Sequence, residues 1–210
     1  MIKVLVADDH AVVRRGVCQI LAAEDDFELI GEAGEYGEIR RMLKDSPCDV
    51  LVLDVQLPGK NGLDIARALR DEDPRLGVLI LSSYPEDQYA VRALRAGARG
   101  YLTKASAPEL IVEAVRAVAA GRRYISAATA SALADTLTGD RSEVPHESLS
   151  DREFQVLKLI ALGRPLAAIA EQLSLSPKTV SVYRSRVLDK MGLSSNGELT
   201  RYAVKLGLVE

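Results

Sequence analysis

The strongest constraint on the fold is an alternation of short branched apolar runs with amphipathic stretches, repeated through the first 121 residues. Runs rich in Val, Ile and Leu are typical of strands covered on both faces. Parallel strands need crossover connections, which amphipathic helices supply. The expected strands are Ile2–Asp8, Phe27–Ala33, Val50–Asp54, Val78–Ser82 and Gly100–Thr103, and the expected helices are Ala11–Ala23, Glu38–Lys44, Leu63–Arg70, Asp87–Ala96 and Pro108–Ala120.

Five such units predict an open parallel α/β sheet with helices on both faces, a flavodoxin-like (βα)5 domain over residues 1–121. Residues 126–137 then indicate one short helix, and residues 139–148 are polar, with Gly and Pro and no periodicity, so we expect a linker over 122–148. From residue 149 to 210 the pattern is helical only and predicts a small all-α domain. Its expected helices are Asp151–Leu162, Leu166–Leu173, Pro177–Met191 and Asn196–Leu206.

Charge is distributed unevenly along the chain. Residues 1–121 carry 15 basic against 20 acidic side chains, residues 122–148 carry 3 against 4, and residues 149–210 carry 9 against 6. An acidic front and a basic back predict different partners for the two parts. Neither an apolar run of the ~20 residues that span a bilayer nor a signal peptide is visible, so we expect a cytoplasmic protein without a membrane partner.

Carboxylates follow two of the expected strands. Asp8 and Asp9 come after the first strand and Asp54 ends the third, so neighbouring strands would bring three carboxylates into one crevice. Like charges at this range repel each other, and a bound cation removes the conflict. Oxygen ligands of this kind suit Mg²⁺. The alternative is that Asp8 and Asp9 only cap the following helix.

A hydroxyl and an ammonium group are expected at the same edge of the sheet, because Ser82 ends the fourth strand and Lys104 follows the fifth. Three acids, a hydroxyl and a lysine suit a phosphoryl group, whose oxygens the cations neutralise while a carboxylate attacks phosphorus. A phosphohydrolase of the haloacid-dehalogenase type would need a second acid two residues after Asp54, where this chain has Gln56. A nucleotide site is disfavoured because the first turn lacks glycines, and a metal triad with His10 because adjacent residues rarely face one ion.

The set Asp8, Asp9, Asp54, Ser82, Tyr101 and Lys104 resembles the receiver signature of two-component response regulators. The resemblance implies that Asp54 is the phosphoacceptor. It also implies that Mg²⁺ (or Mn²⁺) is bound directly by Asp9, through water by Asp8, and by Asp54 and the main-chain carbonyl of Gln56. Ser82 and Lys104 would bind phosphoryl oxygens, and Tyr101 would be the aromatic switch residue rather than a half-buried edge-strand aromatic. Many receivers have a cis proline after the lysine, whereas this chain has Ala105, which leaves the geometry of that turn open.

Residues 166–180 predict a helix, a tight turn and a second helix that begins at the Ser176-Pro177 pair. On the second helix Val180, Val187 and Met191 recur at helical spacing and predict a buried stripe. The opposite side is polar and flanked by cations, which suits the DNA major groove. The alternative is a four-helix interaction domain whose charged faces are solvated.

Three segments, "LSDREFQVLKLIALG", "IAEQL" and "LSPKTVSVYRSRVLDKMG", resemble the LuxR-type helix-turn-helix domain of the NarL/FixJ class, with "SPKTV" and the following Tyr-Arg most similar to regulators of the BvgA, UvrY and GacA type. The resemblance extends over the whole chain. It departs from many relatives at Ala167-Ala168 and Ser181. The expected DNA contacts are Lys178, Thr179, Ser181, Val182, Tyr183, Arg184, Ser185, Arg186 and Lys190.

The sequence therefore predicts a DNA-binding transcriptional regulator rather than an enzyme, one that turns over only its own acyl phosphate. Asp54 would accept a phosphoryl group from a sensor histidine kinase or a phosphotransfer protein. A half-site domain of net charge +3 neutralises few phosphates, so we expect the phosphorylated chain to bind promoter DNA as a homodimer. RNA polymerase is a further candidate partner. A regulator that does not depend on phosphorylation is the remaining alternative.

Overall fold

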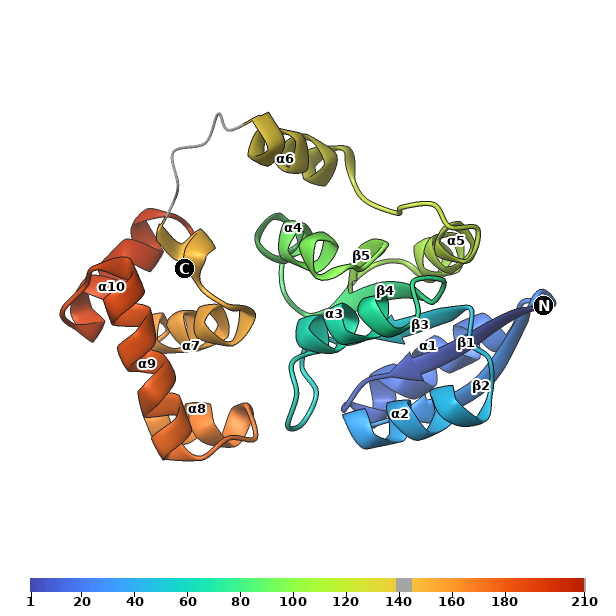
Figure 1. The fold of residues 1–210 in the computed structure, drawn as a ribbon, viewed down its shortest axis with the longest axis horizontal. Coiled ribbons are helices and arrows are strands. Elements are labelled where there is room, and N and C mark those ends of the chain that lie inside the picture. The colour runs from blue at the N-terminus through green and yellow to red at the C-terminus, as the bar shows by residue number, and fades with distance from the viewer. Residues whose placement is uncertain (139–144, 210) are drawn as a thin grey trace. The chain divides into compact units, whose positions relative to one another are not determined.

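The computed structural model describes residues 1–138 and 145–209 (Figure 1). The chain divides into two compact units, residues 1–137 and residues 138–210. Within the described ranges, none of the helices combines the length and the apolar character needed to cross a membrane.

The first unit is built on a five-stranded parallel sheet with the order β2-β1-β3-β4-β5, which confirms the predicted fold class. Asp8 and Asp54 were placed at strand ends by the sequence, and the structure places each of them one residue beyond its strand. The strands are β1 (Ile2–Ala7), β2 (Phe27–Ala33), β3 (Val50–Leu53), β4 (Gly77–Ser82) and β5 (Gly100–Thr103).

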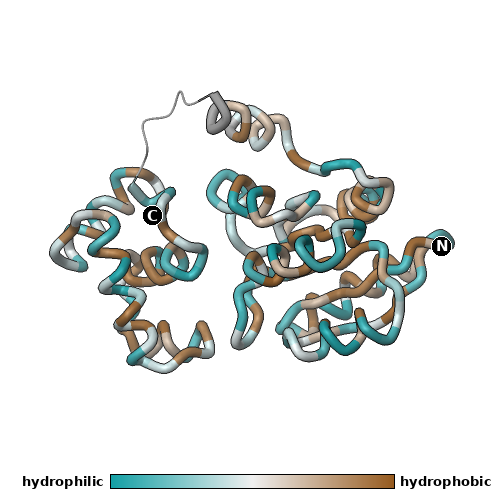
Figure 2. Tube along the Cα trace, viewed as in Figure 1, coloured by the Kyte–Doolittle hydropathy of each residue, from teal (hydrophilic) through white to brown (hydrophobic). Residues whose placement is uncertain are grey.

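Helices cover both faces of this sheet (Figure 1). Helices α1 and α5 pack on one face, where Val17 and Val115 join Val52 in a buried cluster. Helices α2, α3 and α4 cover the other face, to which alternate strand residues point. Figure 2 shows the hydrophobic residues concentrated along the strands. The helices are α1 (Ala11–Ala22), α2 (Tyr36–Asp45), α3 (Gly62–Glu72), α4 (Glu86–Ala96) and α5 (Pro108–Ala119).

The predicted linker carries more structure than its composition indicated. Its expected helix is present as α6 (Ala127–Thr138). Residues 139–144 of the expected irregular stretch lie outside the described residues. Pro145–Ser148 forms a short 3-10 helix, η1, which the absence of periodicity did not predict because a single turn has no period to detect.

The second unit is helical, as predicted, and contains α7 (Asp151–Ala161), α8 (Leu166–Gln172), α9 (Pro177–Met191) and α10 (Asn196–Lys205). Ser176 begins α9 by accepting a hydrogen bond from the Thr179 amide. The turn between α8 and α9 contains Ser174 at φ 53°, a left-handed conformation that closes the turn tightly. The predicted stripe is confirmed, because Val180, Val187 and Met191 are all buried.

Candidate functional site

The acidic site forms where the carboxyl ends of neighbouring strands meet. The β1–β3 ladder continues one residue beyond the strands, since the Asp54 amide donates to the Ala7 carbonyl at 2.9 Å. The Asp8 amide likewise donates to Ala33 at 3.0 Å. These bonds fix both carboxylates at the same height above the sheet, and both side chains are buried. The convergence of Asp8 and Asp54 that the sequence predicted is therefore present in the structure.

Lys104 joins the two buried acids. Its Nζ lies 2.7 Å from Asp54 Oδ2 and 2.6 Å from Asp8 Oδ2. The Lys104 amide donates to the Ser82 carbonyl at 2.8 Å, which anchors the loop after β5 beside the end of β4. The Lys104–Ala105 peptide bond is trans, so the turn forms without the cis geometry that many receivers have. One ammonium thus compensates two carboxylates.

That compensation is incomplete, as the pKa of Asp54 shows. Burial raises this pKa, the hydrogen bond and charge of Lys104 lower it, and the Asp8 charge raises it again, leaving it at about 6. The pKa of Lys104 is raised, because the two carboxylates outweigh the lowering effect of burial. Ionised Asp54 is therefore disfavoured mainly by its burial, and further by the charge of Asp8.

The raised pKa predicts a pH-dependent gain in stability for Asp54→Asn without metal. Between about pH 4 and pH 6 the folded wild type binds more protons than the unfolded chain, so its stability falls as pH rises through this window. Asn avoids that loss, and we expect the variant to gain up to about 3 kcal/mol above pH 6 and little near pH 4. Calorimetric unfolding in EDTA at both pH values measures the difference. A gain that is equal at the two pH values would contradict it.

Asp9 and His10 complete the cluster. The ligand atoms of Asp8, Asp9, His10 and Asp54 all lie within 4.8 Å of one another. His10 Nδ1 is 2.6 Å from Asp9 Oδ1, a convergence that the sequence argument did not expect. The cause is local: His10 precedes α1 in an extended conformation, which directs its ring back towards the acids. Asp8 Oδ1 also accepts a hydrogen bond from the amide of His10, the N-cap residue of α1, at 2.8 Å, so Asp8 fixes the start of the helix as well as facing the cluster.

The chemistry of the donor set fits a hard divalent cation. Carboxylate oxygens are the ligands that Mg²⁺ prefers, usually one or two of them together with water and phosphate oxygens. Asp8 and Asp54 are buried and Asp9 is exposed, so the cluster opens to solvent on one side. Three carboxylates with one ammonium between them leave a negative charge that a cation would balance. Residues Asp8, Asp9 and Asp54 could therefore hold the ion.

Ser82 and Tyr101 lie beside the acids, linked by Tyr84. Ser82 is fully buried, and its Oγ accepts a hydrogen bond from the Tyr84 amide at 3.2 Å. The Tyr101 hydroxyl donates to the Tyr84 carbonyl at 2.8 Å. Tyr101 is 1% exposed, so it is a buried residue and not a half-buried one on an open edge. Burial raises the pKa of Tyr101 well above its ordinary value.

Gly62 allows the chain to return closely past Asp54. A Cβ at this position would lie 2.1 Å from the Asp54 carbonyl oxygen and 2.8 Å from Val55 Cα. The Gly62 amide donates to the Val55 carbonyl at 2.9 Å, and Asn61 caps α3. The loop after β3 can therefore pass this close to Asp54 only because residue 62 has no side chain.

We expect Gly62→Ala to destabilise the first unit by about 1–3 kcal/mol, because backbone at the acidic site must move to admit the methyl group. Gly16→Ala in α1 is the matched control. A Cβ there meets nothing within 4 Å, so this variant should gain roughly 0.5–1 kcal/mol from helix propensity. Urea unfolding of both variants makes the comparison, and a neutral Gly62→Ala would refute the close approach.

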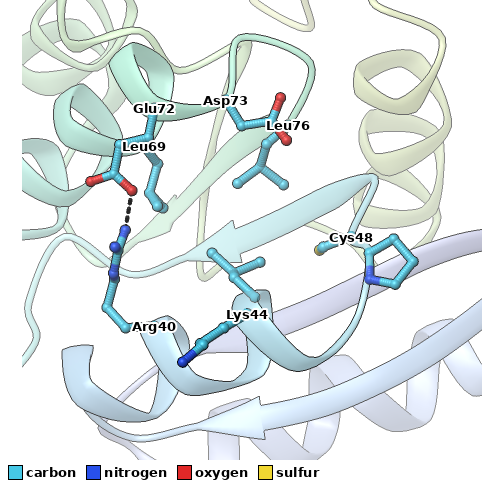
Figure 3. Close-up of a pocket in the computed structure, with 9 residues that line it drawn as sticks. Arg40, Lys44, Cys48, Leu69, Glu72, Asp73 and Leu76 are labelled. Atoms are coloured by element: carbon cyan, nitrogen blue, oxygen red, sulfur yellow. Dashed lines mark hydrogen bonds and ion pairs between the residues drawn. The ribbon is translucent and has the colours of Figure 1, made fainter.

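A separate pocket of about 350 Å³ lies between α2 and α3. Arg40 pairs with Glu72 across it, and Cys48 and Leu76 line its inner wall (Figure 3). Burial raises the pKa of Cys48 to about 12, so its thiol is protonated. Cys48 precedes β3 and Leu76 precedes β4, which places the pocket at the amino ends of the strands, opposite Asp54. We assign it no part in the chemistry there.

Helix α9 presents most of the residues expected to contact DNA. Val182 is 45% exposed, an apolar position on an otherwise polar face. Lys178, Ser181, Ser185, Arg186 and Lys190 are also exposed, whereas Thr179, Tyr183 and Arg184 are half-buried.

Two of these cations already have partners within the second unit. Arg184 Nε donates to Asn196 Oδ1 at 2.6 Å, which ties α9 to α10. Lys190 Nζ lies 2.7 Å from Glu153 Oε2, and Glu153 belongs to the capping box at the start of α7. Lys190 therefore stabilises the helix packing, and Lys178 and Arg186 are the more accessible cations of the face.

Sequence reasoning argued against His10, which the structure places in the cluster, and missed Gly62 and Tyr84. The Asn61-Gly62 pair at the start of α3 was the available signal for Gly62, since Asn caps helices and Gly permits close approach. Tyr84 gave no periodic signal, because it lies in the loop after β4 and acts mainly through its backbone.

A parallel α/β unit with this acid and lysine cluster, joined to a helix-turn-helix unit, defines the response regulators with LuxR-type DNA-binding domains. The chain belongs to this family: the response regulator receiver domain matches residues 4–116, and the bacterial regulatory proteins of the luxR family match residues 147–203. It is a phosphorylation-dependent transcription regulator.

Response regulators of known name match this chain over nearly its full length. The chain is 38% identical to the response regulator GacA of Pseudomonas aeruginosa, covering 100% of this chain and 99% of the relative. It is 35% identical to the response regulator UvrY of Escherichia coli, covering 99% and 96%. The crystal structure of the response regulator ChrA from a heme-sensing two-component system is 32% identical, covers 99% and 98%, and has a TM-score of 0.53.

Proposed function

We propose that Asp54 is the phosphoacceptor of a receiver domain over residues 1–121, connected by a linker over 122–148 to a DNA-binding domain over 149–210. The observation that carries this proposal is the buried Asp54 carboxylate, held 2.7 Å from Lys104 Nζ beside Asp8 and Ser82. An attacking carboxylate, a cation and a hydroxyl donor are then in place around one phosphoryl group.

The transfer is written with Asp54 as nucleophile. A carboxylate oxygen attacks phosphorus of a phosphohistidine, the new P–O bond makes an acyl phosphate, and the P–N bond breaks, returning the electron pair to the imidazole. Lys104 pairs with one phosphoryl oxygen, and the Ser82 hydroxyl donates to another. Because Lys104 now contacts Asp54 and Asp8, it needs only a small movement to follow the charge to the phosphoryl group.

Mg²⁺, or Mn²⁺, would be held by Asp8, Asp9, Asp54 and the main-chain carbonyl of Gln56. When bound, such an ion neutralises phosphoryl oxygens and the developing negative charge. The Gln56 side chain makes a separate hydrogen bond, which its Nε2 donates to the Tyr84 hydroxyl at 2.8 Å. Gln56 offers no acid for a second proton transfer, so the acyl phosphate should be hydrolysed slowly and persist as a signal.

The receiver domain and the DNA-binding domain each imply a partner of their own. A sensor histidine kinase or phosphotransfer protein supplies the phosphoryl group, and promoter DNA binds the α9 face through Lys178, Arg186 and their neighbours. Few cations per copy favour binding by a phosphorylated homodimer on two half-sites. RNA polymerase stays a candidate partner at the promoter.

Acetyl phosphate with Mg²⁺ tests the proposal on the full chain. We expect one phosphoryl group per chain and tighter binding to a duplex selected from a randomised pool by the wild-type protein. EDTA should prevent both changes, because the carboxylates then lack their ion. Unchanged DNA affinity in the phosphorylated protein would contradict the proposal that the phosphoryl group on Asp54 promotes promoter binding.

A further inference from the structure

The linker after α5 is hydrogen-bonded to the strand that carries Tyr101. The Tyr124 amide donates to the Arg99 carbonyl at 2.8 Å, and the Tyr101 amide donates to the Tyr124 carbonyl at 3.2 Å. These bonds form a parallel bridge along the outer edge of β5. A Cβ on Gly100 would lie 3.0 Å from the Tyr124 carbonyl oxygen, so glycine lets the linker approach. The linker thereby covers the edge next to Tyr101.

The start of α6 is attached to the start of α4 through Glu86. Thr129 Oγ1 donates to Glu86 Oε1 at 2.7 Å, and the Ser126 amide donates to the same oxygen at 3.3 Å. Thr129 is 4% exposed. Partial burial raises the pKa of Glu86, but the hydrogen bonds from Ser126 and Thr129 outweigh it and hold that pKa below its usual range. The contact is therefore between a charged acceptor and an enclosed hydroxyl, a strong kind of hydrogen bond.

Glu86 lies two residues beyond Tyr84, which is connected to the acidic site at three points. The Tyr84 amide donates to Ser82 Oγ, its carbonyl accepts from the Tyr101 hydroxyl, and its hydroxyl contacts Gln56 Nε2. Ser82 is thus connected to Glu86 along the β4–α4 loop, and the Asp54 loop is connected to it through the contact of Gln56 with Tyr84. Figure 1 shows α6 following the linker on the side of the unit where α4 and β5 lie.

We propose that the Glu86 contact is a latch that holds the linker helix α6 on the first unit and that a phosphoryl group on Asp54 opens it. The proposal rests on the function assigned to Asp54 above. When the Ser82 hydroxyl turns to a phosphoryl oxygen, the Tyr84 amide loses its acceptor and residues 82–86 shift. Glu86 then withdraws from Ser126 and Thr129. Since α6 leads along the chain to residues 149–210, its release lets two copies of the DNA-binding domain reach two half-sites.

Thr129→Val tests the latch in the full, unphosphorylated chain, because it removes the hydroxyl and keeps the shape. We expect roughly 10-fold faster amide hydrogen exchange in α6 and roughly 10-fold tighter binding to the selected duplex, mainly from the lost hydrogen bond to the charged Glu86. The longer bond that the Ser126 hydroxyl donates to Thr129 Oγ1 at 3.2 Å is lost with it. Thr129→Ser, which restores the donor, should behave as the wild type. Acetyl phosphate should accelerate α6 exchange in the wild type and add little to Thr129→Val.

The outcomes separate the latch from the phosphorylation site. Unchanged α6 exchange and DNA affinity in Thr129→Val would overturn the latch, even if Asp54 is phosphorylated and DNA binding responds. If the wild type takes up no phosphoryl group while Thr129→Val still loosens α6 and tightens DNA binding, the restraint stands and the assignment of Asp54 fails. Faster exchange without any gain in DNA affinity overturns the link between α6 and DNA binding.

Discussion

Asp54→Asn is expected to abolish phosphoryl uptake from acetyl phosphate or a cognate kinase, from one group per chain to none. Asn has no carboxylate to attack phosphorus, while it keeps the size of Asp and the hydrogen bond that the backbone amide of residue 54 donates to the Ala7 carbonyl. The phosphoryl-dependent gain in DNA affinity should disappear with it. Intact-protein mass spectrometry measures the uptake, and hydroxylamine, which cleaves acyl phosphates, identifies the bond.

Asp49→Asn is the matched control, because Asp49 flanks the same strand at its other end and accepts a hydrogen bond from the Lys3 amide at 2.8 Å. It should keep full uptake. Phosphoryl uptake that survives in Asp54→Asn would move the acceptor to another carboxylate, with Asp8 and Asp9 the nearest. Equal loss in both variants would instead indicate a general effect of acid removal on the fold of the unit.

The periodic parts of the fold were predictable from the sequence, since each is encoded locally. Four branched residues in Val50–Leu53 are enough to indicate a buried parallel strand, whose carboxyl end lies at the same edge of the sheet as that of β1. The prediction required β1 and β3 to be neighbours, and the observed strand order meets that condition. The proximity of Asp8 and Asp54 follows from this order. The spacing of Val180, Val187 and Met191 similarly predicted the buried side of α9.

Contacts between segments distant in sequence were less predictable. The sequence placed Lys104 at the right edge of the sheet, but its simultaneous pairing with Asp8 and Asp54 depends on the conformation of the loop after β5. Tyr101 was given a half-buried alternative because β5 is an edge strand, and the structure buries it where Tyr124 in the linker pairs along that edge. Composition marked this segment as a linker and gave no sign of that pairing. The inward turn of His10 likewise depends on backbone angles that carry no periodic signal.

Lys178→Ala combined with Arg184→Ala is expected to weaken DNA binding by roughly 30-fold per half-site at 0.15 M salt. Each phosphate contact contributes about 0.9 to the slope of affinity against salt, so two lost contacts lower the slope by about 1.8. A dimer on two half-sites loses these two phosphate contacts in each copy, so both the affinity loss and the change in slope apply twice. Fluorescence titration of a duplex over a range of salt concentrations gives both the affinity and the slope.

Arg201→Ala with Lys205→Ala is the matched control, since both residues are exposed on α10 and the change in net charge is the same. Long-range attraction alone would make the two double variants equal, and that result would refute the placement of α9 in the groove. Arg184 also holds Asn196, so Lys178→Ala alone separates contact from packing: Lys178 is exposed and should lower the slope by about 0.9 without a change in thermal stability. Lys190→Ala should lower the thermal stability and leave the salt slope unchanged. The Lys190 ammonium is paired with Glu153, and its loss leaves that largely buried carboxylate without its cation.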